Sequence, residues 1–145
     1  MTELTRVSGA LDTVEAIAAK DADAVVKFYA EDGAMFPPNA AKLAGHDGIK
    51  AMWTDLLKIP GFALTFESQN IVLARSGDLA VDTQTYKLVT GEGASQTTEV
   101  GKGVITWVKR NGQWLVLTDM FSSDTPPPAA VPVAAPPMDA PPAPP

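Results

Sequence analysis

The sequence predicts a single α+β domain in which helices come first and an antiparallel sheet follows. Up to residue 57, apolar residues recur every three or four positions, which is the period of an amphipathic helix. From residue 62 the period changes to two, as in strands that bury one face. Helices followed by strands indicate an α+β protein with segregated layers.

Three helices are expected before the sheet. The first is marked by an apolar stripe of Leu4, Val7, Leu11, Val14 and Ala18. Asp21 can cap a second, short helix over residues 22–29, and residues 31–33 end it. The third begins after Gly45 and stops at Pro60-Gly61. Its apolar positions have i, i+3, i+4, i+7, i+8 spacing and are Ile49, Met52, Trp53, Leu56 and Leu57.

One short strand is expected at residues 34–36, where Pro37-Pro38 stops it. The longer strands are expected at residues 62–73, 79–89, 95–109 and 114–121, with glycine-containing turns between them. Long alternating strands joined by tight turns are typical of an antiparallel meander.

The turn at Asn111-Gly112 predicts how the last two strands pair. Asn-Gly supplies two residues of positive φ, as a two-residue type I′ hairpin requires. The expected pairs are Val108 with Leu115, Thr106 with Leu117, and Val104 with Asp119. A three-residue loop with a glycine bulge is the alternative, and it shifts the pairing by one residue. Both arrangements place Asp119 on the strand face of Leu115, Leu117 and Phe121.

Composition divides the 145 residues into two parts. Residues 1–124 are long enough to bury a core and read as one domain. Residues 125–145 are almost entirely proline, alanine and valine, so neither a helix nor a central strand can form there. We expect a disordered spacer with polyproline II character. The alternative is a docking peptide for a proline-recognising partner.

Residue counts exclude several kinds of site. The chain has no cysteine and a single histidine, His46, so thiolate chemistry and multi-histidine metal sites within one chain are excluded. We expect no cofactor. The net charge of −6 without a basic patch argues against nucleic-acid binding, and no apolar run suits a membrane. Residues 1–9 lack the features of a signal peptide, so a cytoplasmic location is expected.

Several motifs together resemble the SnoaL-like group of the nuclear-transport-factor-two-like superfamily. They are Asp21-Ala-Asp-Ala, Phe28-Tyr-Ala-Glu-Asp, Pro37-Pro38, Gly45 ahead of Ile49, Gly77-Asp-Leu-Ala, and residues 107–114 and 119–123. The resemblance covers nearly all of the chain before residue 125. It implies a cystatin-like cone, with three N-terminal helices packed on a strongly curved, mainly antiparallel sheet that encloses a pocket. Family members often dimerise through the outer sheet face.

The resemblance also tests one reaction. Ketosteroid isomerases of this superfamily use a tyrosine on the first helix, an aspartate base before the proline after the first strand, and a second acid on a late strand. An ungapped comparison finds Thr13, Pro37 and Val104 at these positions. Proline cannot accept a proton and valine cannot donate to an oxyanion, so that mechanism does not fit.

The same comparison predicts the residues that face the pocket. They are Val81, Thr83, Thr85, Lys87, Val104, Thr106, Leu117, Asp119 and Phe121. Trp53, on the apolar stripe of the third helix, is expected to cap the pocket. Asp119 is the candidate catalytic residue, because burial would raise the pKa of its carboxyl. The alternatives are a structural carboxylate at Asp119, a solvated Lys87 and core packing for Trp53.

Three aromatic residues are expected on the opposite sheet face, Tyr86, Trp107 and Trp114. Exposed there, they would form a homodimer contact; with another register, they would lie in the core.

Three functions remain open. The first is binding of a small, mostly apolar molecule. The second is an isomerase, cyclase or dehydratase that uses Asp119 as acid or base. The third is a non-catalytic association module.

Overall fold

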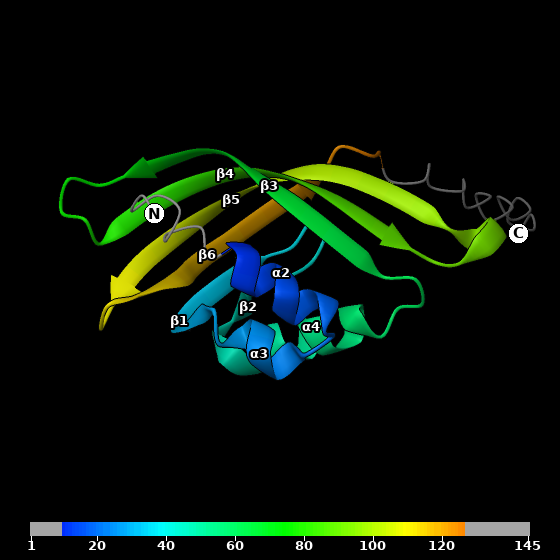
Figure 1. The fold of residues 1–145 in the computed structure, drawn as a ribbon, viewed down its shortest axis with the longest axis horizontal. Helices are drawn as coiled ribbons and strands as arrows, with labels where there is room; N and C mark the ends of the chain where they lie inside the picture. The colour runs from blue at the N-terminus through cyan, green and yellow to red at the C-terminus, as the bar shows by residue number, and fades with distance from the viewer. Residues whose placement is uncertain (1–9, 127–145) are drawn as a thin grey trace, which may run out of the picture.

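The structure is a computed structural model that describes residues 10–126, where three α-helices and six strands form (Figure 1). The helices are α2 (Ala10–Ala18), α3 (Ala22–Val26) and α4 (Gly45–Leu57). The strands are β1 (Tyr29–Phe36), β2 (Leu43–Ala44), β3 (Ala63–Leu73), β4 (Leu79–Thr90), β5 (Thr97–Arg110) and β6 (Gln113–Ser123). The 3₁₀ helix η1 (Gly93–Ser95) lies between β4 and β5.

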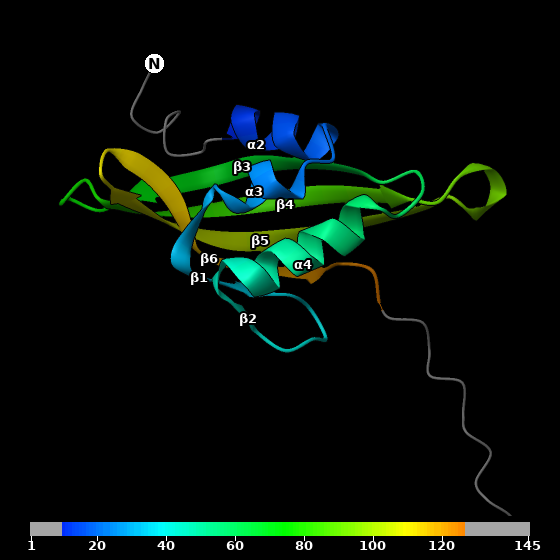
Figure 2. The same cartoon turned by 90° about the horizontal axis from the view of Figure 1, so that it is seen from below.

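The strands form one curved, open sheet in the order β2-β1-β6-β5-β4-β3. Every neighbouring pair is antiparallel except β1 and β6, which are parallel. All three helices lie on one face of the sheet (Figure 2). The core lies between these helices and the sheet, and includes Val25, Met35, Ile49, Trp53 and Trp107. The predicted α+β architecture, with helices on a curved, mainly antiparallel sheet, is confirmed.

Helix boundaries follow the predicted signals in two cases. The Asp21 carboxylate accepts a hydrogen bond from the Ala24 amide at 3.0 Å and caps α3. Helix α4 begins at Gly45, whose φ of 74° suits glycine, and ends before Pro60. The part of the first helical stripe before residue 10 lies outside the described residues, as does the chain after residue 126.

The second helix is shorter than predicted. It ends at Val26, and Tyr29 already belongs to β1. The Phe28 carbonyl accepts a hydrogen bond from the Val116 amide at 2.7 Å, so the sheet captures the chain at this point. Tertiary pairing therefore overrides the local helical pattern, and it turns the Tyr29 side chain into the core.

The Asn111-Gly112 turn forms the predicted two-residue loop. Both residues have positive φ, 50° and 77°, and Arg110 pairs with Gln113. The predicted pairing of Val108 with Leu115 is also confirmed.

Beyond Val116 the predicted register is wrong, because a β-bulge interrupts β6. Trp107 pairs with Val116 and Thr106 with Thr118, which leaves Leu117 as the extra residue. Val104 consequently pairs with Met120 and not with Asp119. The bulge moves Asp119 from the face of Leu115 to the face of Val116.

None of the described helices combines the length and the apolarity needed to span a membrane.

Candidate functional site

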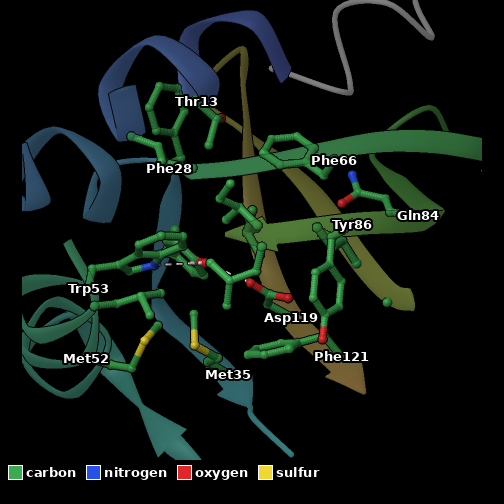
Figure 3. Close-up of a pocket in the computed structure, with 18 of the residues that line it drawn as sticks. Thr13, Phe28, Met35, Met52, Trp53, Phe66, Gln84, Tyr86, Asp119 and Phe121 are labelled. Atoms are coloured by element: carbon green, nitrogen blue, oxygen red, sulfur yellow. Dashed lines mark hydrogen bonds between the residues drawn. The ribbon is translucent and has the colours of Figure 1, made fainter. Parts of the chain in front are cut away.

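A cavity of about 140 Å³ lies between the helices and the inner face of the sheet (Figure 3). Its wall is mostly apolar, with Phe28, Met35, Met52, Phe66 and Phe121 among its side chains. The volume is close to that of apolar cavities that hold one aromatic ring. The cavity is therefore large enough for a small ligand without rearrangement of the fold.

Asp119 is the main polar group of this wall. Its Oδ2 accepts a hydrogen bond of 2.8 Å from the Tyr29 hydroxyl. The Tyr29 hydroxyl oxygen accepts a bond of 3.3 Å from the Trp53 indole Nε1. In Figure 3 the Asp119 carboxylate lies between the Trp53 and Tyr86 rings. Strands β1 and β6 and helix α4 thus each contribute one member of a connected polar chain.

Burial controls the ionisation of this group. Desolvation raises the pKa of the Asp119 carboxyl from 3.8 to about 6, and the hydrogen bond from Tyr29 limits the rise. Burial and the adjacent carboxylate raise the pKa of the Tyr29 hydroxyl well above its ordinary value. At neutral pH, Tyr29 is a proton donor in a hydrogen bond and Asp119 is a carboxylate close to its titration range.

Tyr29 is fixed by its backbone as well as by its side chain. The His46 Nε2–H, from the first turn of α4, donates to the Tyr29 carbonyl oxygen at 2.7 Å. The single histidine therefore has a positioning role and stands outside the cavity-lining set.

A second tyrosine–carboxylate pair lines the same cavity. The Tyr86 hydroxyl of β4 donates to Glu99 Oε1 of β5 at 2.7 Å. The Tyr86 ring packs edge-on against Phe121, with ring centroids 6.0 Å apart. It also lies over Gly101, its partner across the strands, where a Cβ atom would collide with the ring. The absence of a side chain at Gly101 therefore allows this placement of Tyr86.

Behind the wall is a fully buried acid, Asp82. Its Oδ2 accepts hydrogen bonds from Ser68 at 3.0 Å and from Gln84 Nε2 at 2.7 Å. Burial raises the pKa of Asp82, and these two hydrogen bonds oppose the rise. Its Oδ1 and the Trp107 Nε1 form no hydrogen bond of standard geometry with a described residue, although the indole still lowers the pKa of Asp82.

Three predicted site residues line the cavity: Asp119, Trp53 and Phe121. Their inward placement has separate origins. Trp53 lies on the apolar stripe of α4 that packs on the sheet. Asp119 and Phe121 reach the inner face because the bulge at Leu117 precedes them.

Seven other predicted residues do not line the cavity: Val81, Thr83, Thr85, Lys87, Val104, Thr106 and Leu117. On β4 the inner positions that line the cavity are Gln84, Tyr86 and Leu88, and on β5 they are Glu99, Gly103, Ile105 and Trp107. Since side chains alternate along a strand, the residues between these belong to the outer face. Leu117 is the extra residue of the bulge.

The predicted aromatic patch on the outer face is also corrected. Tyr86 and Trp107 line the cavity, and Trp114 packs against the core. The assignment of faces was inverted because the unbulged register was carried through to the centre of the sheet. Of the three isomerase positions, Thr13 lines the cavity, whereas Pro37 and Val104 do not.

Sequence reasoning missed Tyr29, Glu99 and Gln84. Glu99 and Gln84 lie on strands whose side chains alternate between two faces, but the prediction assigned the other set of positions to the pocket. Tyr29 was hidden by the helical pattern that surrounds it. Within residues 10–126, no group of three or more acidic or histidine side chains is arranged to hold a metal ion.

Residues 10–117 match the family model of the SnoaL-like domain. No curated protein matches the chain. Among solved structures, a ketosteroid isomerase-like protein from Erwinia carotovora atroseptica has a TM-score of 0.73 at 20% identity, over 86% of this chain and 98% of that chain.

Two further structures are similar. A protein of unknown function from Mycobacterium tuberculosis has a TM-score of 0.72 at 15% identity, covering 84% of this chain and 72% of that one. An NTF2-like protein with a cystatin-like fold from Novosphingobium aromaticivorans has a TM-score of 0.69 at 15% identity, covering 83% of each chain. At these identities the likeness establishes the fold alone.

The raised pKa of Asp119 predicts how stability depends on pH. Between pH 3.8 and about pH 6 the folded chain binds the carboxyl proton of Asp119 more tightly than the unfolded chain does. The free energy of unfolding therefore falls as the pH rises through this range. Asparagine does not titrate and retains an oxygen for Tyr29. We expect Asp119→Asn to be roughly 2 kcal/mol more stable than wild type at about pH 7.5.

Urea unfolding at several pH values measures this difference. The gain should shrink below about pH 6 and nearly vanish at about pH 3.5, where both states hold the proton. Asp55→Asn, at an exposed position of α4, is the control and should give no gain of this size. A destabilised Asp119→Asn at neutral pH would show that ionised Asp119 is stabilised by the fold.

Proposed function

Because the chain belongs to the SnoaL-like domain family, we propose that its cavity binds a small, mostly apolar molecule with one polar group directed at Asp119. The observation that carries this proposal is an apolar cavity of about 140 Å³ with a desolvated carboxylate on its wall. Apolar walls with a few placed polar groups are typical of ligand pockets. The volume suits a molecule with the bulk of about one ring.

Acid–base catalysis by Asp119 is the second candidate function. A carboxyl whose pKa lies near 6 exchanges protons readily near neutrality, and this carboxyl borders the cavity. An enolate or similar intermediate would also need a hydrogen-bond donor for its oxygen. The Tyr29 and Tyr86 hydroxyls already donate to carboxylates and the Trp53 indole donates to Tyr29. Binding without chemistry is therefore the better-supported function.

Association through the outer face of the sheet is compatible with either function. Exposed apolar side chains on this face include Val72 at 57%, Val81 at 38%, Val104 at 45% and Met120 at 53%. Val72 pairs with Val81, and Val104 pairs with Met120, so they lie on neighbouring strands of one face. The helices of the described residues 10–126 all lie on the opposite face (Figure 1). We propose that a second copy of this chain packs on this outer apolar face.

Ligand binding is tested by filling the cavity. Benzyl alcohol is a suitable probe because it combines one ring with one polar group. We expect the wild-type protein to bind it at millimolar concentration or below, with shifts of the Trp53 and Trp107 indole N–H signals in NMR spectra. Ile105→Trp should abolish these shifts because the larger ring occupies the cavity.

The matched control for this experiment is Val104→Trp, which places the same side chain on the outer face of the same strand. It should leave binding unchanged. Equal binding by both folded variants would place the probe elsewhere and refute the proposal.

The catalytic candidate makes a separate prediction. A carboxylate base would remove a proton next to the carbonyl of the β,γ-unsaturated isomer of cyclohexenone and return it at the far alkene carbon. If Asp119 catalyses this class of reaction, ultraviolet absorbance should follow formation of the conjugated ketone. Asp119→Asn should then lose about 100-fold in rate. No acceleration by the wild-type protein would leave binding as the function.

The association proposal is tested by sedimentation. We expect the wild-type protein to sediment as a dimer, and the double variant Val81→Lys with Met120→Lys to sediment as a monomer, because buried lysines cost desolvation energy. Ala41→Lys, at an exposed position outside this face, is the control. A monomeric wild-type protein at tens of micromolar would contradict the proposal.

A further inference from the structure

The polar groups of the cavity wall are unbalanced in a way that bears on ligand chemistry. Both tyrosine hydroxyls donate their hydrogen to a carboxylate: Tyr29 donates to Asp119, and Tyr86 donates to Glu99. Each hydrogen bond uses only one carboxylate oxygen. Among the described residues, Asp119 Oδ1 and Glu99 Oε2 accept no hydrogen bond. An ionised carboxylate can only accept, so both vacant positions call for a donor.

Gln84 adds a third acceptor to the same wall. Its amide nitrogen must face Asp82, since a carboxylate requires a donor opposite it. This assignment leaves the carbonyl oxygen on the other side of the amide, and Figure 3 shows it turned toward the middle of the cavity. The oxygen is the acceptor end of a side chain that is 8% exposed and is held by a buried network.

The charge of the cavity wall also favours a ligand that donates hydrogen bonds. Its described lining residues include two acids and no lysine, arginine or histidine. An anionic ligand would face two carboxylates and would gain no cationic partner among the described lining residues. A cationic ligand would neutralise them. It would also lie close to aromatic rings such as Trp53 and Trp107, and the face of such a ring attracts cations.

We propose that the preferred ligand of this cavity is a protonated amine carried on an apolar body of about one ring. The ammonium group donates to the vacant oxygen of Asp119, Glu99 adds negative charge farther along the same wall, and the body occupies the apolar space between the helices and the sheet. This inference rests on the proposed ligand-binding function and adds its chemical class.

Neutral donors are the main competitors for these acceptors. A hydroxyl group has a single hydrogen and no charge, so it can donate one neutral hydrogen bond to Asp119 and gains nothing from the charge of Glu99. Hydrogen bonds between charged groups are about twice as strong as neutral ones. The ammonium group loses hydration on entry, which reduces but does not cancel this advantage. An amine should therefore bind more tightly than an alcohol of the same shape.

Three probes of matched shape test the inference: benzylamine, benzyl alcohol and benzoate. Dissociation constants come from NMR titration of the full-length protein at about pH 7.5, where the amine is protonated. We expect benzylamine to bind about tenfold more tightly than benzyl alcohol, and benzoate to bind most weakly. Asp119→Asn should weaken amine binding much more than alcohol binding, and Glu99→Gln should reduce the preference for the amine by a smaller factor.

Glu67→Gln is the matched control because it removes one negative charge from an exposed position of β3. It should keep the amine preference, which separates local contact from the overall negative charge. If the alcohol binds as tightly as the amine, or benzoate binds best, the inference is overturned and the proposed binding function stands. If no probe binds, both are overturned. If Glu67→Gln weakens amine binding as much as Asp119→Asn, the preference is only long-range.

Discussion

The hydrogen bond between Tyr29 and Asp119 depends on one feature of this fold, the pairing of the first strand, β1, with the last strand, β6. Parallel pairing of β1 with β6 places Met35 opposite Asp119 and brings the start of β1 under α4. Trp53 then reaches the Tyr29 hydroxyl from the helix. The bulge at Leu117 is required as well, because without it the Asp119 side chain would belong to the outer face. Site and architecture therefore share one set of contacts.

Features of this fold that depend on interactions between residues close in the sequence can be predicted from the sequence, whereas those that depend on pairing between distant residues cannot. Helix α4 and the Asn111-Gly112 turn depend on signals within a few residues, and both were predicted correctly. The bulge has no comparable signal, because Leu117 is as suitable for a regular strand as for an irregular one. A one-residue error there inverts every later face assignment. Asp119 and Phe121 of the predicted site residues do line the cavity, while the predicted residues on β4 and β5 belong to the opposite face.

The same inversion explains why the chemistry of the wall could not be anticipated. With Thr83, Thr85 and Thr106 inside, the cavity would offer hydroxyl groups that both donate and accept. With Gln84, Tyr86 and Glu99 inside, the hydroxyl hydrogens are already committed and the remaining atoms mostly accept. The first wall would suit a carbonyl or an oxyanion. The second suits a donor, so the register of one hairpin decides which class of ligand the fold can take.

Asp119 is costly for the fold on its own, which constrains why such a group is there. Desolvation raises its pKa, so ionisation at neutral pH reduces the free energy of unfolding. An apolar side chain of similar size would pack in the same place without this cost. A ligand that donates to Asp119 lowers the pKa again and restores part of the lost stability by linkage. A positively charged ligand would therefore offset the cost of ionising this buried acid. It would also give a role to the tyrosine that holds the acid and to the acceptor-rich wall.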